Sequence, residues 1–301
     1  MKIRIEILSG MVYNLKNEHT GRVCPAVEGW ICMGQVIAVC SGKGGTGKTT
    51  VCAAVAACLA AEGKRVLCID ADMGLRNLDI SLGMAETAPI SFADVLTGRY
   101  SLSEVTPHPE IPGLFLLTAP VAERPETIRF QDFGSLLETV RDYFDFCLID
   151  SPAGIGDGFY FATLYADRVL IVAAPDPAAL RDAAGTADQL HLMGKQDVKL
   201  VVNLVTPAAF RALDWTVDDM MDEIGLQLMG IVPEDEHVVL AAAANLALIC
   251  YTDRGAALAA STSPAVCRGK RSRFCGSDRS RCFLFACVLF DCPRILKEVP
   301  I

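Results

Sequence analysis

The chain has 301 residues, of which 52% are hydrophobic and 21% charged, so it can bury a large core and is not a disordered protein. Its 27 Lys and Arg against 36 Asp and Glu give a net charge of −9. That balance argues against a protein whose main task is to neutralise nucleic-acid phosphates, and we expect no specific nucleic-acid partner.

The charge is unevenly spread along the chain. Residues 1–32 carry four basic against three acidic side chains, residues 33–260 carry 15 against 30, and residues 261–301 carry eight against three. The first segment shows no hydrophobic period, and Met33 stands just before the first predicted strand. We therefore predict an N-terminal extension outside the fold (1–32), a folded domain (33–260) and an atypical basic, Cys-rich tail (261–301), either disordered or foreign.

Eight of the 13 cysteines lie before residue 261, mostly in apolar runs, as small buried side chains do in a reducing compartment. The other five fall in the last 41 residues, at spacings that match no zinc-binding pattern. Residues 1–10 alternate charged and apolar side chains and lack the apolar core of a signal peptide. We expect a cytoplasmic protein.

From Gln35 onward, short β-branched runs alternate with stretches long enough for amphipathic helices. Runs that are apolar at nearly every position predict strands buried on both faces. The predicted strands are Val36–Cys40, Arg65–Asp70, Leu114–Thr118, Phe146–Asp150, Val169–Ala173, Lys199–Leu204 and Leu228–Val232. The predicted helices are Lys48–Glu62, Phe92–Leu96, Phe130–Asp142, Pro177–Met193, Val217–Ile224 and Glu236–Ala244. This alternation predicts an α/β fold with a single doubly wound, mainly parallel sheet and helices on both faces.

The most specific motif follows the first predicted strand and opens the first predicted helix. It consists of Gly42, Lys43, Gly44, Gly45, Thr46, Gly47, Lys48, Thr49 and Thr50, and it satisfies the pattern GxxxxGK[ST]. Backbone N–H groups of such a loop curl around phosphate oxygens, and the helix adds the positive end of its dipole. Lys48 can bridge the β- and γ-phosphates of ATP, and the Thr49 hydroxyl can ligate Mg²⁺. A glycine-rich turn without a ligand is the alternative, but the strand–loop–helix context favours a P-loop.

A second lysine, Lys43, follows the first glycine of this loop. With it the loop resembles that of the deviant Walker A ATPases, whose signature lysine reaches across a nucleotide-sandwich dimer. Such a lysine acts as an arginine finger does, since a cation supplied in trans offsets the charge on the transferring phosphoryl group. The alternative is a solvated loop lysine.

Acidic residues stand at the ends of two predicted strands. Asp70 and Asp72 close one strand, and Asp150 closes another. Ligands of doubly wound folds gather at the carboxyl ends of strands, so these acids can lie beside the phosphates. We expect Asp150 to act as the Walker B group, holding Mg²⁺ through water or Thr49, Asp70 to help fix the Mg²⁺ shell, and Asp72 to orient the attacking water. Capping of the following helices is the alternative role.

Three further runs are similar to the MinD family of division-site-selecting ATPases. They are Asp-Ala-Asp-Met-Gly-Leu-Arg-Asn-Leu-Asp at 70–79, Asp-Ser-Pro-Ala-Gly at 150–154 and Ile-Val-Pro-Glu-Asp at 231–235. The resemblance implies an Mg-ATPase of low intrinsic rate that forms a homodimer on ATP. It also implies peripheral binding to the inner face of the cell membrane, recruitment of a MinC-like division inhibitor and stimulation by a MinE-like protein.

The resemblance also extends to single positions. It implies that Asn203 contacts the adenine and that Pro233 lies beside the ring, whereas a strand-end turn and a loop breaker are their alternative roles. It places helix Pro177–Met193 in the face that the family shares between MinC and MinE.

The tail differs from the family, which ends in a short Lys-rich amphipathic helix. Four basic residues between 268 and 273 precede the apolar run Cys282–Phe290, which is a composition that a crude membrane anchor would have. That run is continuous, however, and forms no helical stripe. Our interpretation is an out-of-frame or otherwise foreign terminus.

Three other functions compete with a division-site switch. A ParA-like partition ATPase would need a basic DNA-binding surface, against the acid excess of residues 33–260. An electron-transfer ATPase would need paired cysteines near the switch loops, yet Ser-Pro-Ala-Gly follows Asp150 and Cys147 lies within a strand. A nucleotide-gated scaffold without turnover would not need Lys43 and Asp72, which are both present.

Overall fold

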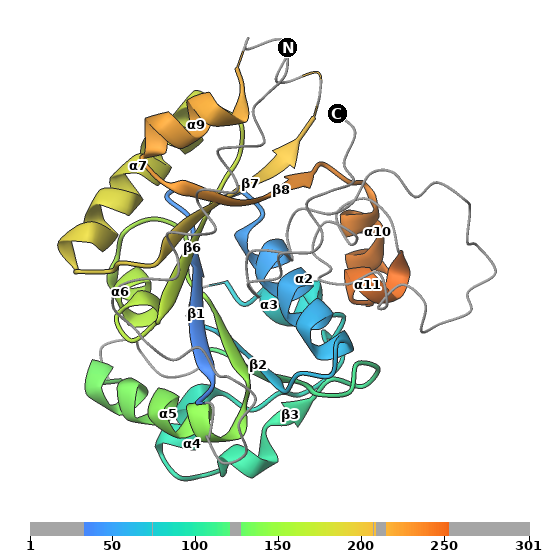
Figure 1. Cartoon of the computed structure of the whole chain (residues 1–301). Helices are drawn as coiled ribbons and strands as arrows, with labels where there is room; N and C mark the ends of the chain where they lie inside the picture. Colours follow the sequence, from blue (N-terminus) through green and yellow to red (C-terminus); the bar gives the residue numbers. More distant parts are fainter. Residues whose placement is uncertain (1–32, 74, 121–127, 207, 209–214, 253–301) are drawn as a thin grey trace, which may run out of the picture.

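The computed structural model describes residues 33–73, 75–120, 128–206, 208 and 215–252 (Figure 1). The predicted N-terminal extension and the basic tail, with its apolar run, lie outside these residues. Among the helices of the described part, none has the length and apolar character needed to cross a membrane.

A single sheet forms the centre of the described part, with strand order β3-β4-β2-β5-β1-β6-β7-β8. The strands are β1 (Gln35–Cys40), β2 (Val66–Asp70), β3 (Thr106–Pro107), β4 (Leu114–Leu117), β5 (Phe146–Asp150), β6 (Arg168–Ala173), β7 (Val198–Val205) and β8 (Gln227–Pro233). All neighbours pair in parallel except the short edge strand β3, which is antiparallel to β4. The predicted doubly wound, mainly parallel sheet is confirmed.

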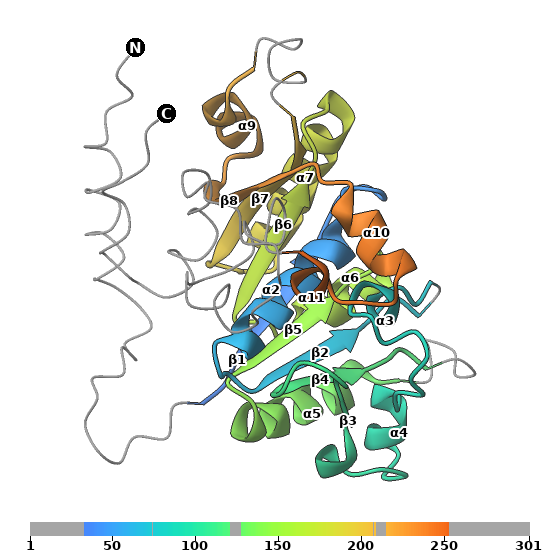
Figure 2. The same ribbon diagram turned by 90° about the vertical axis from the view of Figure 1, so that its right-hand side faces the viewer.

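Helices cover both faces of this sheet (Figure 2). On one face lie α2 (Lys48–Ala61), α3 (Leu78–Ser81), α10 (His237–Ala243) and α11 (Leu248–Tyr251). On the other lie α4 (Phe92–Leu96), α5 (Phe130–Tyr143), α6 (Asp157–Thr163), α7 (Pro177–Leu192) and α9 (Val217–Ile224). A short 3-10 turn, η1 (Leu102–Glu104), precedes β3.

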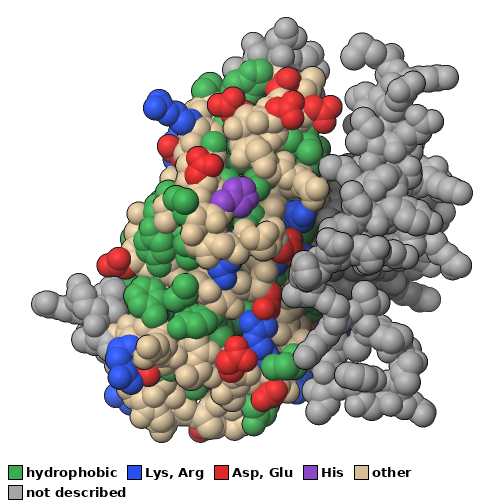
Figure 3. Space-filling view, turned by 60° about the vertical axis from the view of Figure 1, so that its left-hand side comes forward, with side chains coloured by type: hydrophobic (Ala, Val, Ile, Leu, Met, Phe, Trp, Pro, Cys, Tyr) green, Lys and Arg blue, Asp and Glu red, His purple; other side chains and the backbone are tan. Residues whose placement is uncertain are grey.

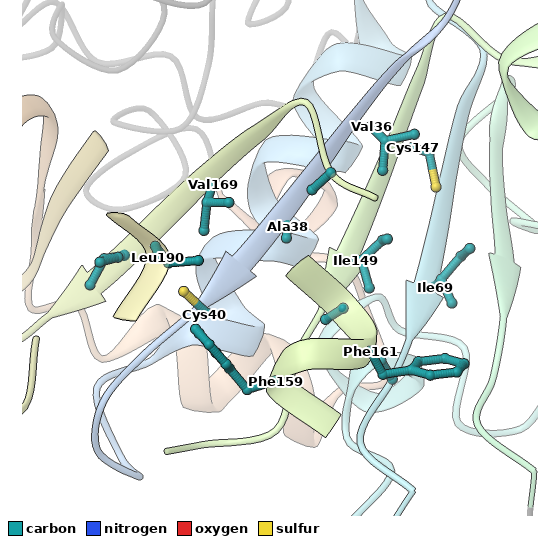
Figure 4. Close-up of a cluster of buried hydrophobic side chains, with 14 of the residues drawn as sticks. Val36, Ala38, Cys40, Ile69, Cys147, Ile149, Phe159, Phe161, Val169 and Leu190 are labelled. Atoms are coloured by element: carbon teal, nitrogen blue, oxygen red, sulfur yellow. The ribbon is translucent and has the colours of Figure 1, made fainter. Parts of the chain in front are cut away.

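The central strand β1 shows why its sequence is apolar at every position after Gln35. Val36, Ala38 and Cys40 face the core under α5, α6 and α7, whereas Ile37 and Val39 face the core under α2. All five side chains are fully buried. Figure 4 shows the first of these two cores. A strand covered on both faces has no polar position, so its run of hydrophobic residues is continuous.

The sequence did not reveal α3, α6, α11, η1 and β3, and the boundaries of the other elements agree with the structure to within one residue. Helices α3 and α11 have four residues each, too few to repeat a helical period. Helix α6 has seven residues, and its Phe159 and Phe161 are buried against the sheet (Figure 4). Phe161 stacks on Phe133 of α5 with ring centroids 4.1 Å apart. Tertiary packing of this kind stabilises a helix too short to be stable alone.

The carboxyl ends of three strands meet at one edge of the sheet. Strand β5 lies between β2 and β1, and in its register Asp150 is opposite Asp70 on one side and Val39 on the other. The loop that follows β1 therefore begins beside both aspartates. Strand order thus brings together the predicted phosphate loop and the predicted carboxylates.

The buried His108, which follows β3, makes the stability of the fold depend on pH. His108 Nε2 donates to the Leu82 carbonyl (2.7 Å), and its Nδ1 accepts from the N–H groups of Glu110 (3.0 Å) and Ile111 (2.9 Å). These bonds require a neutral ring, and burial lowers the pKa of His108. The stabilisation is therefore complete above the unfolded pKa of about 6.5 and is lost as the pH falls below it.

We expect the His108→Asn variant to be less stable than the unchanged protein at pH 7.5 by about 1–3 kcal/mol, because the shorter side chain cannot reach the buried Leu82 carbonyl, which loses its donor. The difference should shrink toward pH 5.5, where the unchanged protein must keep an uncharged histidine. Urea unfolding at several pH values measures it. A difference that is constant over this range would contradict the assignment.

Candidate active site

The phosphate loop connects β1 to α2 and is held from two sides. Gly47 has a left-handed φ of 80°, and a Cβ placed on it would come within 2.2 Å of Asn203 Nδ2. A Cβ on Gly42 would meet the backbone oxygen of Asp182, in α7, at 2.3 Å. Only glycine fits at these two positions. The loop is therefore clamped between the end of β7 and helix α7.

Three side chains form a hydrogen-bonded cluster below the loop. Lys48 Nζ donates to Asp150 Oδ1 at 2.7 Å, and these side chains are only 8% and 2% exposed. Thr49 Oγ1 donates to Asp150 Oδ2, also at 2.7 Å, and Lys48 Nζ lies 3.3 Å from Thr49 Oγ1. Burial raises the pKa of Asp150, and the charge of Lys48 opposes that rise. One carboxylate thus holds both loop side chains that the sequence assigns to phosphate and Mg²⁺.

Asp70 is buried beside this cluster and organises the segment that follows it. Its Oδ1 accepts the N–H of Asp72 at 2.9 Å, and its Oδ2 accepts the N–H groups of Asn77 (3.3 Å) and Leu78 (3.2 Å). Burial, and next the charge of Asp150, raise the pKa of Asp70 to about 7. Asp70 therefore links the strand end to the start of α3.

Asp72 is half-buried, and its Oδ1 accepts the N–H of Leu75 at 3.0 Å. The structure places it two residues beyond the end of β2, and the charges of Asp72 and Asp150 lie close enough for Asp72 to raise the pKa of Asp150. Asp72 thus lies at the edge of the buried cluster, where its carboxylate is accessible to water.

The donor set suits a magnesium ion. Asp70 and Asp150 are neighbours in the sheet, and burial raises both pKa values, with the charge of Asp150 adding to the rise at Asp70 and that of Asp72 adding to the rise at Asp150. Within the described part of the chain no group of three or more His, Cys, Asp and Glu side chains can hold a metal by itself. Mg²⁺ prefers oxygen ligands and takes few from the protein, because it keeps waters and binds substrate phosphates. Two carboxylates and the Thr49 hydroxyl match that preference.

Lys43 lies on the α7 side of the loop and not in the buried cluster. Its Nζ is 3.5 Å from Asp176 Oδ1, and both side chains are 44% exposed. The same oxygen caps α7 by accepting the N–H groups of Ala178 (3.0 Å) and Ala179 (3.1 Å). Asp176 is not among the residues predicted from the sequence, although an aspartate followed by proline at a helix start is a recognisable cap.

The remaining predicted residues line the same edge of the sheet. Asn203 is 4% exposed, and its Nδ2 donates to the Thr46 carbonyl at 2.8 Å. Thr46 is buried, and its hydroxyl has no hydrogen-bond partner among the described residues. Thr50 lies half-buried in the first turn of α2. Pro233 closes β8, opposite Val205 of β7.

Comparisons with known proteins agree with this geometry. A family model described as an AAA domain matches residues 34–200. The septum site-determining protein MinD of Synechocystis is 36% identical over 210 residues, which cover 69% of this chain and 79% of that protein.

Two solved structures share the fold. MinD in a MinC:MinD complex from Aquifex aeolicus superimposes with a TM-score of 0.69 at 33% identity and covers 75% of this chain and 92% of that one. MinD with Mg-ADP from Pyrococcus horikoshii has a TM-score of 0.66 at 25% identity and covers 75% and 91%.

A doubly wound parallel sheet in which a glycine-rich loop leads into a helix that begins with a lysine, and in which that lysine is paired with an aspartate at the end of the neighbouring strand, defines a P-loop nucleotide-binding protein. Within that class, this chain is similar to septum site-determining proteins over most of its length. The chain belongs to the MinD family.

Because its pKa is raised, Asp70 should make the stability of the protein decrease with rising pH, whereas His108 makes it increase. The folded protein, measured with a chelator and without nucleotide, binds a proton on Asp70 up to about pH 7, whereas the unfolded chain releases it near pH 3.8. The contribution of Asp70 to stability therefore falls as the pH rises from about 4 through 7.

We expect the Asp70→Asn variant to be less stable than the unchanged protein at pH 5.5, because its amide cannot replace both acceptors. The gap should narrow by on the order of 2 kcal/mol by pH 8, since one pKa unit is worth about 1.4 kcal/mol. Urea unfolding measures it, and the exposed Asp157→Asn serves as control. A gap that widens with pH would refute the assignment.

Proposed function

We propose that this chain is an ATP-driven, dimerising switch that hydrolyses ATP to ADP and phosphate and takes part in placing the division septum. The observation that carries the proposal is the buried Lys48–Asp150–Thr49 cluster below a loop that also exposes a second lysine, Lys43. Membership of the MinD family, whose relatives are named septum site-determining proteins, supports it.

The loop and its cluster account for nucleotide binding. The N–H groups of residues 42–47 and the start of α2 would bind the phosphates, and Lys48 would exchange Asp150 for the β- and γ-phosphate oxygens. Thr49, Asp70 and Asp150 would hold Mg²⁺, directly or through water. That ion, when bound, supplies positive charge to the phosphates.

Hydrolysis needs a positioned water and a way to offset the charge that develops on the γ-phosphoryl group. Asp72 would orient the water, because it lies at the exposed edge of the buried carboxylates. Lys43 would enter the site of a second copy and stabilise the transferring group there. Asn203 and Pro233 would lie along the adenine. Because one of the two lysines comes from the partner, turnover depends on dimerisation.

The partners follow from the family. The MinD of Aquifex aeolicus has been solved as a MinC:MinD complex, which supports a MinC-like partner for this chain. We further propose peripheral binding to the inner face of the cell membrane and stimulation of a low intrinsic rate by a MinE-like protein. On the face formed by α5, α6, α7 and α9, acidic side chains gather toward α9, which begins with Asp218 and Asp219 (Figure 3). That distribution favours protein partners over DNA.

Replacing each of the two lysines should remove a different property of the protein. The Lys48→Ala variant should lose ATP binding, because the buried Asp150 charge loses its partner and the phosphates lose their ligand. The Lys43→Ala variant should still bind ATP but neither dimerise on it nor turn it over, with kcat reduced on the order of a thousandfold. Nucleotide titration, analytical ultracentrifugation and phosphate release measure the three properties.

The matched control is Lys64→Ala, at the opposite end of α2, which should behave as the unchanged protein does. If Lys43→Ala dimerises on ATP and hydrolyses it at the normal rate, the proposed switch is wrong.

Membrane binding can be tested with the full chain. We expect residues 1–301 to sediment with anionic liposomes in ATP and to stay in the supernatant in ADP, because a dimer presents two copies of the chain to the lipid surface where a monomer presents one. Equal recovery in the supernatant with either nucleotide would remove membrane binding from the proposal.

A further inference from the structure

Strand β7 is irregular just where it reaches the phosphate loop. Its pairing with β8 shifts register twice: β8 has an extra residue between Leu200 and Val201 of β7, and after Val202 opposite Ile231 the pairing resumes at Val205 opposite Pro233, so β7 has one extra residue in this second interval. Leu204, within it, has a φ of 57° and is 37% exposed. A left-handed leucine is a genuine outlier, because its side chain crowds the backbone there. Such strain persists only where the surrounding structure requires it.

The irregularity determines where the neighbouring side chain points. A β-bulge bends its strand and redirects side chains, and here the residue before the left-handed leucine is Asn203. Its amide is 4% exposed and donates to the Thr46 carbonyl at 2.8 Å. An asparagine that ends a strand would otherwise bond to its own turn or to water. The bulge instead turns it toward the loop.

A second observation shows how close this contact is. The amide nitrogen of Asn203 would lie only 2.2 Å from a Cβ placed on Gly47, which is too close for both atoms to fit. Thr46 C=O and Gly47 N–H belong to one peptide unit, and no peptide bond in the described residues is cis. In a trans peptide the carbonyl and the N–H point in opposite directions. Holding the carbonyl toward β7 therefore turns the Gly47 N–H away from β7.

We propose that Asn203 is a positioning residue of the phosphate loop: it orients the Thr46–Gly47 peptide so that the Gly47 N–H is presented to the phosphates. The inference rests on the proposed function, since it concerns the same nucleotide site. It differs from a contact to the adenine in one respect that can be measured. A residue that acts through the loop affects every ligand that carries the phosphates, whatever base is attached.

The direct test compares Mg-ATP with Mg-tripolyphosphate, which has no base. Each displaces a fluorescent ATP analogue from the full chain. In the Asn203→Ala variant, we expect both affinities to fall by the same factor, about tenfold, because the loop peptide loses this bond to β7. Alanine adds no charge near the phosphates. Thermal unfolding without ligand checks that the variant is folded.

A pair of variants beside Asn203 tests the same inference without altering the amide. Leu204→Val should lower both affinities together, since a β-branched residue resists the left-handed conformation that aims Asn203. Leu204→Gly adopts that conformation freely and should keep both affinities. This pair decides the matter if Asn203→Ala does not fold.

Two results would overturn the inference. One is a loss of ATP affinity in Asn203→Ala with tripolyphosphate affinity unchanged, which would make Asn203 a residue for the base alone. The other is Leu204→Val and Leu204→Gly binding tripolyphosphate equally well. Failure of the proposed function looks different, because the unchanged protein would then bind neither ligand.

Discussion

The site depends on one buried ion pair, between Lys48 at the start of α2 and Asp150 at the end of β5. The two groups come from elements that are 102 positions apart in sequence but adjacent in space, because β5 is the neighbour of β1 in the sheet. Removing either partner would leave a charge in a place where water cannot reach it, which typically costs 3–5 kcal/mol. The pair is also poised for exchange. A phosphate can replace the carboxylate on Lys48, and a divalent cation can replace the lysine on Asp150.

The packing around that pair explains why the phosphate loop has few alternative conformations. Helix α7 closes one side at Gly42, and Asn203 closes the other at Gly47, each so tightly that a Cβ would collide. Loops are ordinarily the adaptable part of a fold, but phosphate binding needs N–H groups that are already aimed. In this protein packing against two separate elements supplies that preorganisation. The ion pair of Lys43 with Asp176 remains half-exposed, so a partner can compete for the lysine at little cost.

The sequence predicted the main features of the fold because strands buried on both faces are continuous apolar runs, and the loop motif stands between such a strand and a helix. The predicted strand topology also placed Lys48, Thr49, Asp70 and Asp150 at one edge of the sheet. The short helices α3 and α11 escaped detection, since four residues carry no period. The cap at Asp176 is a local pattern that the sequence carries, an aspartate followed by proline, whereas the left-handed Leu204 depends on contacts with distant parts of the chain. No local sequence pattern predicts a leucine with positive φ, so the contact of Asn203 with the phosphate loop could be found only in the structure.

The central claim is that each nucleotide site is completed by a lysine from a second copy. Mixing two variants tests it directly: Lys43→Ala, which keeps Asp72, and Asp72→Ala, which keeps Lys43. Each alone should be inactive. In an equal mixture each mixed dimer has one complete site and one incomplete site, so ATP hydrolysis should return to a substantial fraction of the unchanged rate, with an upper limit of about half if every dimer is mixed. A mixture that hydrolyses ATP no faster than the two variants do separately would contradict the account.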